Sequence, residues 1–310
     1  MGPHPAVAQV RSAVRAALAE CGPVVFVACS GGADSLALAA GLAFEAPRAG
    51  VRAGLVTVDH GLQEASDLQA ARVAAVGYEL DFDPVEVIGV SVGDAGGPEA
   101  AARTARYGAL DALAQAHDAD VFLGHTLDDQ AETVLLGLGR GSGPRSIAGM
   151  RPRSGRYARP LLGVRRSVTE AACAALGLDT WVDPHNTDPA YQRVRLRTEV
   201  LPLLENVLQG GVAEALARTA DLMQDDLDAL DDLAAQVDGI DPATLAALPR
   251  ALRTRVLLTW LRAAGTPEIS AAQVAAVESL ITGWHGQGPI DLPGGVRVSR
   301  VSGRLEIDRP

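Results

Sequence analysis

The sequence predicts an α/β protein with a doubly wound, mainly parallel sheet and a smaller, mainly helical C-terminal domain. Short apolar runs alternate with helical patterns over residues 24–138. Hydrophobic residues make up 48% of the 310-residue chain, whereas aromatic residues make up only 4%. Alternating strands and helices are typical of βαβ units, and a core of Ala, Val and Leu suits helices packed on a parallel sheet.

Four apolar runs are predicted to be buried strands. They cover residues 24–29, 55–58, 85–90 and 121–123. Apolar runs this short fit parallel strands that are covered on both faces. Polar residues or glycine follow each run. Because ligands of open α/β sheets bind beyond the carboxyl ends of the strands, we expect these ends to line one crevice.

Helical patterns separate and follow these runs. We expect helices near residues 34–44, 66–77, 98–117, 128–138 and 166–177, and mainly helical stretches at 212–237 and 242–284. The Gly/Arg/Pro-rich stretch 139–160 is predicted to be a long loop, residues 183–189 a cluster of turns, and residues 288–308 a small hairpin region. We therefore predict a first domain over residues 1–210, which includes the Arg-rich loop, and a second over 211–310.

The segment Ser30-Gly31-Gly32-Ala33-Asp34-Ser35 joins the first strand directly to a helical pattern. Its glycines allow positive φ and a close approach to a ligand, and free amides at a helix start bind anions such as phosphate. Its serines add hydroxyl donors. Asp34 would repel phosphates unless a divalent cation lay between, so we expect Mg²⁺. An N-capped helix start without a ligand is the alternative.

Composition excludes several chemistries. The chain has no lysine, because all 27 of its Lys+Arg residues are arginine. It therefore lacks the lysine of a Walker loop and the Schiff-base lysine of pyridoxal phosphate enzymes. Cys21, Cys29 and Cys173 form no CxxC pair, which argues against a disulfide framework or a zinc ribbon. No signal segment or long uncharged apolar run is found, so we expect a cytoplasmic protein that does not associate with membranes.

An acidic group follows the fourth strand. His125, Asp128, Asp129 and Glu132 are spaced i, i+3, i+4 and i+7, so a helix places them toward one face. Three carboxylates on one face need a cation, which is a metal, an arginine or a substrate ammonium. Acidic residues that merely favour the helix dipole are the alternative.

Arginines are concentrated although the net charge is −11. Eleven arginines and only four acidic residues lie between residues 140 and 197. We expect this tract to attract phosphates, and a solvated surface without a partner is the alternative. Upstream, Arg103 and Arg106 share a helical face with Glu99 and Tyr107 and are candidate counter-charges for the carboxylates. A surface pair of Glu99 with Arg103 is equally consistent with the spacing.

Taken together, these residues resemble the PP-loop ATP pyrophosphatases and, within them, the tRNA(Ile)-lysidine synthetases. The resemblance covers about residues 24–205. The matching motifs, in the family's order, are Ser30–Ser35, Asp59-His60-Gly61-Leu62, Glu99–Tyr107, Gly124–Thr133, Arg140-Gly141-Ser142-Gly143, Gly149-Met150, Arg159-Pro160-Leu161-Leu162 and Asp183-Pro184-His185-Asn186. Thr126 stands where many members have a second histidine, and Val194 where an asparagine is common.

The resemblance implies a ligase that acts on the AUA-reading tRNA(Ile) with a CAU anticodon. In the family, ATP adenylates the wobble cytidine at C2, pyrophosphate leaves, and the ε-amine of free L-lysine displaces AMP. The resulting lysidine changes the specificity of the tRNA from methionine to isoleucine. The chain resembles the short form with one C-terminal domain. We expect that domain to recognise the tRNA, with Arg250, Arg253, Arg255 and Arg262 as phosphate contacts.

Site residues carry over by motif. The resemblance implies that Ser30–Ser35, His60 and His125 bind ATP, that Asp34 binds Mg²⁺, and that Asp129 and Glu132 receive the lysine ammonium groups. It implies that Arg103 and Arg106 hold phosphates or the lysine carboxylate. The residues expected to bind tRNA are Arg140, Arg145, Arg151, Arg153, Arg193 and Arg197.

Two other functions remain open. The nearest is tRNA thiolation, which uses the same loop to adenylate a base before sulfur attacks, although the three cysteines here are isolated. A non-catalytic tRNA-binding adaptor is the alternative from another class. Whether the protein is a monomer or a homodimer is also left open.

Overall fold

The computed structural model describes residues 2–61, 66–93, 97–141, 143–181, 183, 188–266 and 269–309, except for the side chains of Pro98 and Glu99. The motif residues Leu62, Ser142 and 184–186, and most of the predicted turn cluster, lie outside the described residues. The chain divides into two compact units, which are described separately. The first comprises residues 1–139 and 149–220, and the second residues 140–148 and 221–310.

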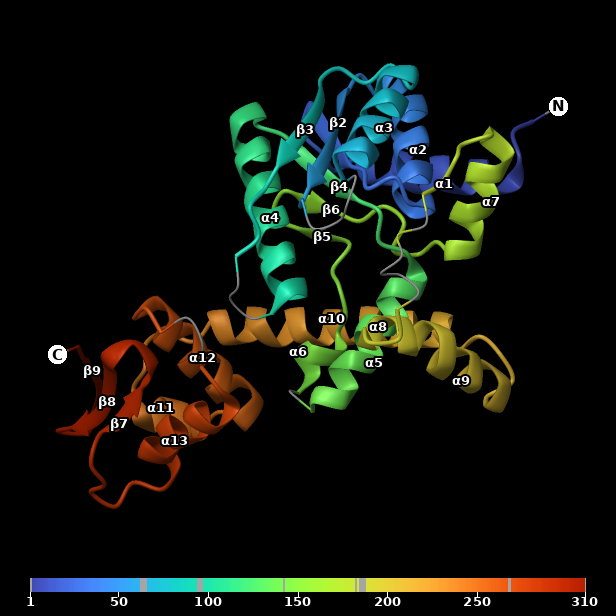
Figure 1. The fold of residues 1–310 in the computed structure, drawn as a ribbon. Helices are drawn as coiled ribbons and strands as arrows, with labels where there is room; N and C mark the ends of the chain where they lie inside the picture. The colour runs from blue at the N-terminus through green and yellow to red at the C-terminus, as the bar shows by residue number, and fades with distance from the viewer. Residues whose placement is uncertain are drawn as a thin grey trace. The chain divides into compact units, whose positions relative to one another are not determined.

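The first unit contains a six-stranded sheet in the order β3-β2-β1-β4-β6-β5 (Figure 1). All neighbouring strands from β3 to β6 are parallel, and β5 is antiparallel to β6. The strands are β1 (Val24–Ala28), β2 (Arg52–Asp59), β3 (Val85–Gly89), β4 (Asp120–Leu123), β5 (Arg153–Ser154) and β6 (Tyr157–Ala158). The four predicted strands are thus confirmed. The winding direction reverses between β1 and β4, the place where open sheets bind ligands.

Helices cover both faces of this sheet (Figure 1). Because side chains alternate along a strand, Val25 and Val27 of β1 pack with α1, α2 and α7, whereas Val24 and Phe26 pack with α4. This arrangement confirms the doubly wound prediction. The helices of the unit are α1 (Pro5–Leu18), α2 (Ala33–Ala49), α3 (Ser66–Glu79), α4 (Pro98–His117), α5 (Leu127–Arg140), α7 (Arg166–Leu176), α8 (Gln192–Arg195), the π-helical turn η2 (Leu196–Val200) and α9 (Leu201–Val207).

Several elements were not predicted. The sequence interpretation assigned no helix to residues 5–18, although Val7, Val10 and Val14 of α1 are buried at helical spacing. It also assigned none to residues 192–207. The predicted long loop 139–160 instead contains α6 (Pro144–Ile147) and the hairpin of β5 and β6. These strands have two residues each, which is too short to show a strand pattern in the sequence, and the prediction therefore missed them.

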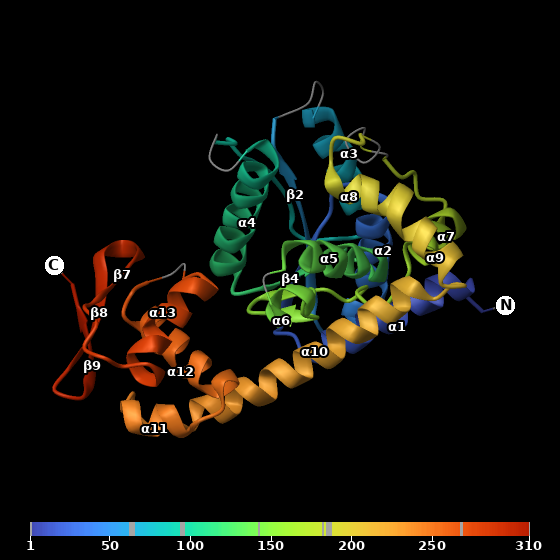
Figure 2. The same ribbon diagram turned by 90° about the horizontal axis from the view of Figure 1, so that it is seen from below.

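The second unit is mainly helical, as predicted. It contains α6 and the part of α10 (Val212–Ala235) that begins at Asp221. Its other elements are α11 (Pro242–Ala247), α12 (Arg250–Ala263), α13 (Ala271–Thr282), β7 (Ile290–Leu292), the 3₁₀ turn η3 (Pro293–Gly295), β8 (Val296–Val301) and β9 (Arg304–Asp308). The strands form an antiparallel sheet in the order β7-β8-β9, and their inner residues share one core with α12 and α13 (Figure 2).

Helix α10 carries the boundary between the units. Its residues Ala213 and Ala217 pack with Leu127 of α5, and Glu205 accepts hydrogen bonds from the amides of residues 212 and 213. The first unit therefore extends to Ala220. The functional division at residue 210 stays a prediction. No helix among the described residues is long and apolar enough to cross a membrane.

Gly54 of β2 provides a test of the sheet packing. A Cβ atom at this position would overlap three atoms of the Phe26 ring, which is fully buried. We expect Gly54→Ala to lower the free energy of unfolding by about 1–3 kcal/mol, the usual cost of overpacking a core. Urea unfolding measures this change. Gly108→Ala in α4, where a Cβ meets no atom within 4 Å, is the matched control, and equal stability of the two variants would contradict the packing described.

Candidate functional site

The segment after β1 forms the predicted loop. Gly31 has a φ of +87°, whereas Gly32 has a φ of −74°, so only the first glycine uses the left-handed region. The Ser35 hydroxyl donates to the Gly32 carbonyl at 3.0 Å and accepts from the Ser30 amide at 3.2 Å. The first intrahelical bond runs from Leu36 N to Gly32 O at 3.0 Å. The amides of residues 32–35 therefore have no intrahelical acceptor and can bind an anion.

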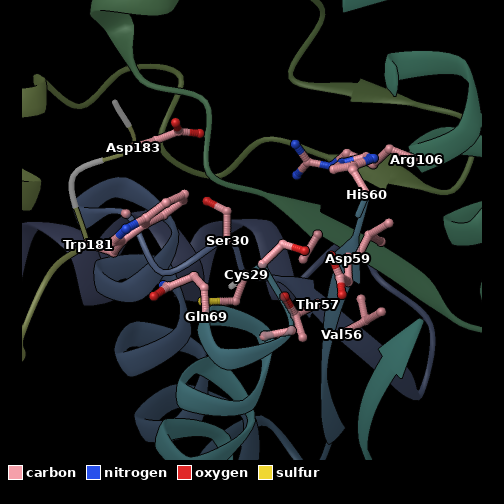
Figure 3. Close-up of a pocket in the computed structure, with 15 residues that line it drawn as sticks. Cys29, Ser30, Val56, Thr57, Asp59, His60, Gln69, Arg106, Trp181 and Asp183 are labelled. Atoms are coloured by element: carbon pink, nitrogen blue, oxygen red, sulfur yellow. The ribbon is translucent and has the colours of Figure 1, made fainter. Parts of the chain in front are cut away.

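A pocket of about 370 Å³ lies beyond the carboxyl ends of β1 and β2 (Figure 3). Ala28 and Val56 contribute apolar surface, and Ser30 links the pocket to the loop. Trp181 closes one side, and its amide donates to the Gly31 carbonyl at 2.9 Å. A hollow of this size that combines apolar and polar side chains beside a phosphate-binding loop suits the base and ribose of a nucleotide.

Predicted residues His60 and Arg106 also line this pocket. Burial and the nearby Arg106 lower the pKa of His60, and burial lowers the pKa of Arg106. Burial, opposed by the charge of Asp129 and reinforced by those of Arg159 and Arg106, lowers the pKa of His125 to about 4. His125 is therefore neutral near pH 7. Within the described part of the chain, Nδ1 of His60 and Nδ1 of His125 are buried and have no hydrogen-bond partner.

Asp129 is held in place from two sides. Its Oδ2 accepts hydrogen bonds from both the amide and the hydroxyl of Thr126, each at 2.8 Å. Its Oδ1 is 2.6 Å from a terminal nitrogen of Arg166. Burial alone would raise the pKa of Asp129, but Arg166 and Thr126 hold it below its usual value. Thr126, at the position where the family often has histidine, thus orients this carboxylate.

Arg166, at the start of α7, is the central cation of the site. Besides Asp129, its guanidinium contacts Asp34 at 3.3 Å and Glu132 at 3.5 Å. The hydroxyl of Thr169 also hydrogen-bonds to Asp34. Although burial alone would lower it, the surrounding carboxylates raise the pKa of Arg166, which keeps its charge. Arg166 therefore joins the phosphate loop to the acidic face of α5.

The acidic face of α5 is neutralised by arginines downstream of it. Asp128 accepts hydrogen bonds from Arg165 at 3.0–3.2 Å and from the Arg166 amide at 2.7 Å. Glu132, fully buried, contacts Arg197 at 2.8 Å and Arg193 at 3.6 Å. Arg103 and Arg106, which the sequence predicted as counter-charges, do not pair with these carboxylates. Arg103 lies over the Tyr107 ring and is exposed, and Arg106 lines the pocket.

The sequence interpretation therefore missed Arg165, Arg166 and Thr169 as site residues. The two arginines belong to a tract of eleven, and nothing in the pattern separates them from the others. Thr169 lies one helical turn after Arg166, and its hydroxyl also donates to the Arg166 carbonyl at 2.7 Å. Only the tertiary fold, which brings α7 against α2, reveals its contact with Asp34.

The residues present fit a magnesium ion that is held mostly by a nucleotide. Among the described residues, no three His, Cys, Asp or Glu side chains are grouped so that they could hold a metal by themselves. Mg²⁺ is usually bound by one or two carboxylates together with substrate phosphates and water. Asp34 offers one carboxylate in the first turn of α2, next to the loop. Burial raises the pKa of Asp34, whereas Thr169 and Arg166 favour its charged form.

The arginines expected to bind tRNA occupy different environments. In the first unit, Arg193 and Arg197 contact Glu132, and Arg151 is exposed. Arg153 instead bonds to Asp120, the first residue of β4, at 2.6 Å, and so lies at the opposite end of the sheet from the pocket. In the second unit, Arg140 is exposed and Arg145 pairs with Asp231 at 2.7 Å.

Comparison with known proteins places this site in a family. Residues 8–204 match the family model of the PP-loop domain, and residues 241–306 match that of the TilS substrate binding domain. The chain is 56% identical over 319 residues to the tRNA(Ile)-lysidine synthase of Thermobifida fusca, covering 99% of this chain and 98% of the relative. It is 53% identical to that of Streptomyces coelicolor, covering 99% of each.

A solved structure shares the fold at low sequence identity. The U34-tRNA thiolase NcsA from Methanococcus maripaludis, with its [4Fe-4S] cluster, has a TM-score of 0.57 and 18% identity. The match covers 71% of this chain and 80% of the thiolase. At this identity the likeness shows the PP-loop fold alone.

The three ion pairs of Arg166 predict that its replacement lowers the stability of the protein strongly. Replacing Arg166 by Leu leaves Asp34, Asp129 and Glu132 with one less counter-charge. We expect Arg166→Leu to lower the free energy of unfolding by about 3–5 kcal/mol, as measured by urea unfolding. Arg156→Leu, which removes the exposed pair with Asp118, is the control and is expected to cost less than about 1 kcal/mol. Similar losses for both variants would show that Arg166 has no special role.

The lowered pKa of His125 predicts that the free energy of unfolding depends on pH. Its pKa is about 4 in the folded protein, against 6.5 for a histidine in water, so the unfolded chain binds more protons between pH 6.5 and 4. The contribution of this group to stability is complete above pH 6.5 and is lost as the pH falls toward 4. We expect His125→Gln to lose less stability over this interval than the unmodified protein. Urea unfolding at several pH values measures this, with exposed His285→Gln as control, and identical pH profiles for both variants would contradict it.

Proposed function

The chain belongs to the tRNA(Ile)-lysidine synthase family, and we propose that it joins L-lysine to the wobble cytidine of tRNA(Ile) with a CAU anticodon. ATP is converted to AMP and pyrophosphate, and the lysidine product reads as isoleucine rather than methionine. One observation carries the proposal. Arg166 contacts both Asp34, beside the phosphate loop, and the pair Asp129 and Glu132, so a nucleotide site and an amine site adjoin.

The first step is the adenylation of cytidine. Its C2 oxygen attacks the α-phosphorus of ATP, a new O–P bond forms, and the bond to pyrophosphate breaks. The loop amides and the Ser30 hydroxyl bind the phosphates, and Arg106 adds a positive charge in the pocket. Mg²⁺ held by Asp34 would neutralise charge on the departing pyrophosphate.

The second step is the attack of lysine. We infer that Asp129 and Glu132 bind its ammonium groups, because charge-assisted hydrogen bonds to two carboxylates both neutralise and orient an amine. The ε-ammonium group gives a proton to solvent, the free amine attacks C2, the C2–O bond breaks, and AMP leaves with the bonding electron pair. Positioning the amine next to the nucleotide site makes this attack effectively intramolecular.

The cysteines disfavour tRNA thiolation. Burial raises the pKa of the thiols of Cys21, Cys29 and Cys173, the last to about 11. Such thiols contain little thiolate, which is the reactive form in sulfur transfer. A non-catalytic adaptor is disfavoured as well, because it would have no use for a phosphate loop with a pocket beside it and a buried acidic cluster joined to that loop by Arg166.

We infer that the C-terminal domain reads the tRNA. Within α12, Arg253 and Arg255 are largely buried against Glu278 and Asp231, which limits their use as phosphate contacts. Arg250 and Arg262 are exposed, and they are the better candidates for positioning contacts to the RNA backbone. A tRNA substrate implies a cytoplasmic location.

The direct test is mass analysis of unmodified tRNA(Ile) with a CAU anticodon after incubation with the protein, ATP and lysine. We expect the anticodon fragment to gain the mass of lysine less one water. A sulfur-dependent mass change would support thiolation, and an unchanged tRNA without pyrophosphate release would support the adaptor.

Glu132→Gln tests the amine site. Loss of a buried charge-assisted bond is expected to reduce kcat/KM for lysine about 10- to 100-fold, since such bonds contribute about 1.5–3 kcal/mol. The KM for ATP in tRNA-dependent pyrophosphate release should change less than about twofold, because the variant leaves the loop intact. Glu199→Gln, an exposed acid that pairs with Arg195, is the control. Equal losses for lysine and ATP would assign Glu132 to the nucleotide site instead.

A further inference from the structure

Glu132 is enclosed by guanidinium groups. Its Oε1 lies 2.8 Å from Nε of Arg197 and 3.5 Å from Arg166. Its Oε2 lies 3.3 Å from a terminal nitrogen of Arg197 and 3.6 Å from Arg193. The side chain has no exposed surface. Both carboxylate oxygens of Glu132, one of the two acids of the proposed amine site, are therefore already paired with arginines.

A lysine ammonium group cannot simply be added to this arrangement. Three guanidinium groups surround this buried carboxylate, two of them shared with Asp129, and an added ammonium group would meet like-charge repulsion from them in surroundings that screen charges poorly. It would also need a hydrogen-bonding position that the arginines occupy. The ammonium group must therefore exchange with one of the arginines.

Arg197 is the arginine that an ammonium group must displace, because it donates hydrogen bonds to both carboxylate oxygens of Glu132. Arg166 is fixed by Asp34 and Asp129 as well as Glu132, and its side chain is only 18% exposed. Arg193 is 40% exposed, but it lies 3.6 Å from Glu132 and donates its hydrogen bond to Thr133, so its departure would free no hydrogen-bonding position on Glu132. Arg197 depends on Glu132, with a second, 3.7 Å contact to Asp129, and its side chain is 30% exposed. It can therefore leave toward solvent.

Space for the incoming group adjoins the same contact. A cavity of about 140 Å³ is lined by Asp128, Glu132, Arg197, Leu201 and Glu205, among other residues. The carboxylates and the apolar side chains suit an alkyl ammonium chain, and Arg165 and Arg166, which also line the cavity, are paired with Asp128 and Asp129. Arg193 and Arg197 lie four residues apart and so share one side of the α8–η2 segment. Both are partly exposed, so an RNA phosphate can reach them.

We propose that Arg197 is an exchangeable counter-ion that closes the lysine site in the free protein and opens it when a tRNA phosphate takes up its guanidinium. This inference rests on the proposed function. Lysine and Arg197 then compete for Glu132, and tRNA strengthens lysine binding by removing the competitor. Since coupling between two ligands is reciprocal, lysine should strengthen tRNA binding by the same factor.

The test is the affinity for radiolabelled lysine in equilibrium dialysis without tRNA. We expect Arg197→Gln to bind lysine at least tenfold more tightly than the unmodified protein. Arg197→Lys retains a cation and should bind lysine no more tightly than the unmodified protein. Arg195→Gln, on the same segment but paired with exposed Glu199, is the matched control and should leave the affinity unchanged. Unchanged or weaker binding by Arg197→Gln would overturn the proposal.

A second measurement needs no variant and covers the case in which Arg197→Gln does not fold. The affinity of the unmodified protein for lysine, measured with and without saturating tRNA(Ile), should be higher with tRNA. Equal affinities would overturn the counter-ion role while leaving the proposed function intact. Absence of lysine binding under every condition, including with tRNA and ATP, would overturn both.

Discussion

The site depends on one arrangement of charges, the contact of Arg166 with three carboxylates from two helices. Asp34 lies in the first turn of α2, and Asp129 and Glu132 lie on α5. Acids buried this closely would repel each other or take up protons without an internal cation. Arg166 supplies that cation from the start of α7, a third helix. The phosphate loop and the acidic face of α5 are therefore held at a fixed separation before any substrate binds.

The parallel sheet makes this convergence possible. The loop after β1 and the turn after β4 lie next to each other because these strands are neighbours at the reversal of the winding. Gly124, at the end of β4, has no side chain at a place where a Cβ would lie 3.0 Å from the Ser35 backbone. The two helix starts can thus approach closely. The phosphate loop and the acidic face of α5 therefore adjoin, as the proposed function requires.

The sequence predicted the parts of this arrangement that depend on local pattern. The strands follow from short apolar runs, and the loop follows from the motif at Ser30–Ser35. The acidic face follows from the helical spacing of His125 to Glu132. The counter-charges could not be found in this way, because Arg166 and Arg197 reach Glu132 from 34 and 65 residues away along the chain. The neighbouring sequence does not distinguish these two arginines from Arg153, which bonds to Asp120 at the far end of the sheet. Assigning an arginine to a carboxylate requires the tertiary fold.

The coupling free energy between Arg166 and Asp129 tests the central claim most directly. It is obtained from a double-mutant cycle in which Arg166→Gln, Asp129→Asn and the double variant are unfolded in urea. Since residues in one buried ion-pair network couple by about 0.5–3 kcal/mol, we predict a value of at least about 1.5 kcal/mol. Additive effects, with a coupling below about 0.3 kcal/mol, would show that the two groups act independently and would contradict the account.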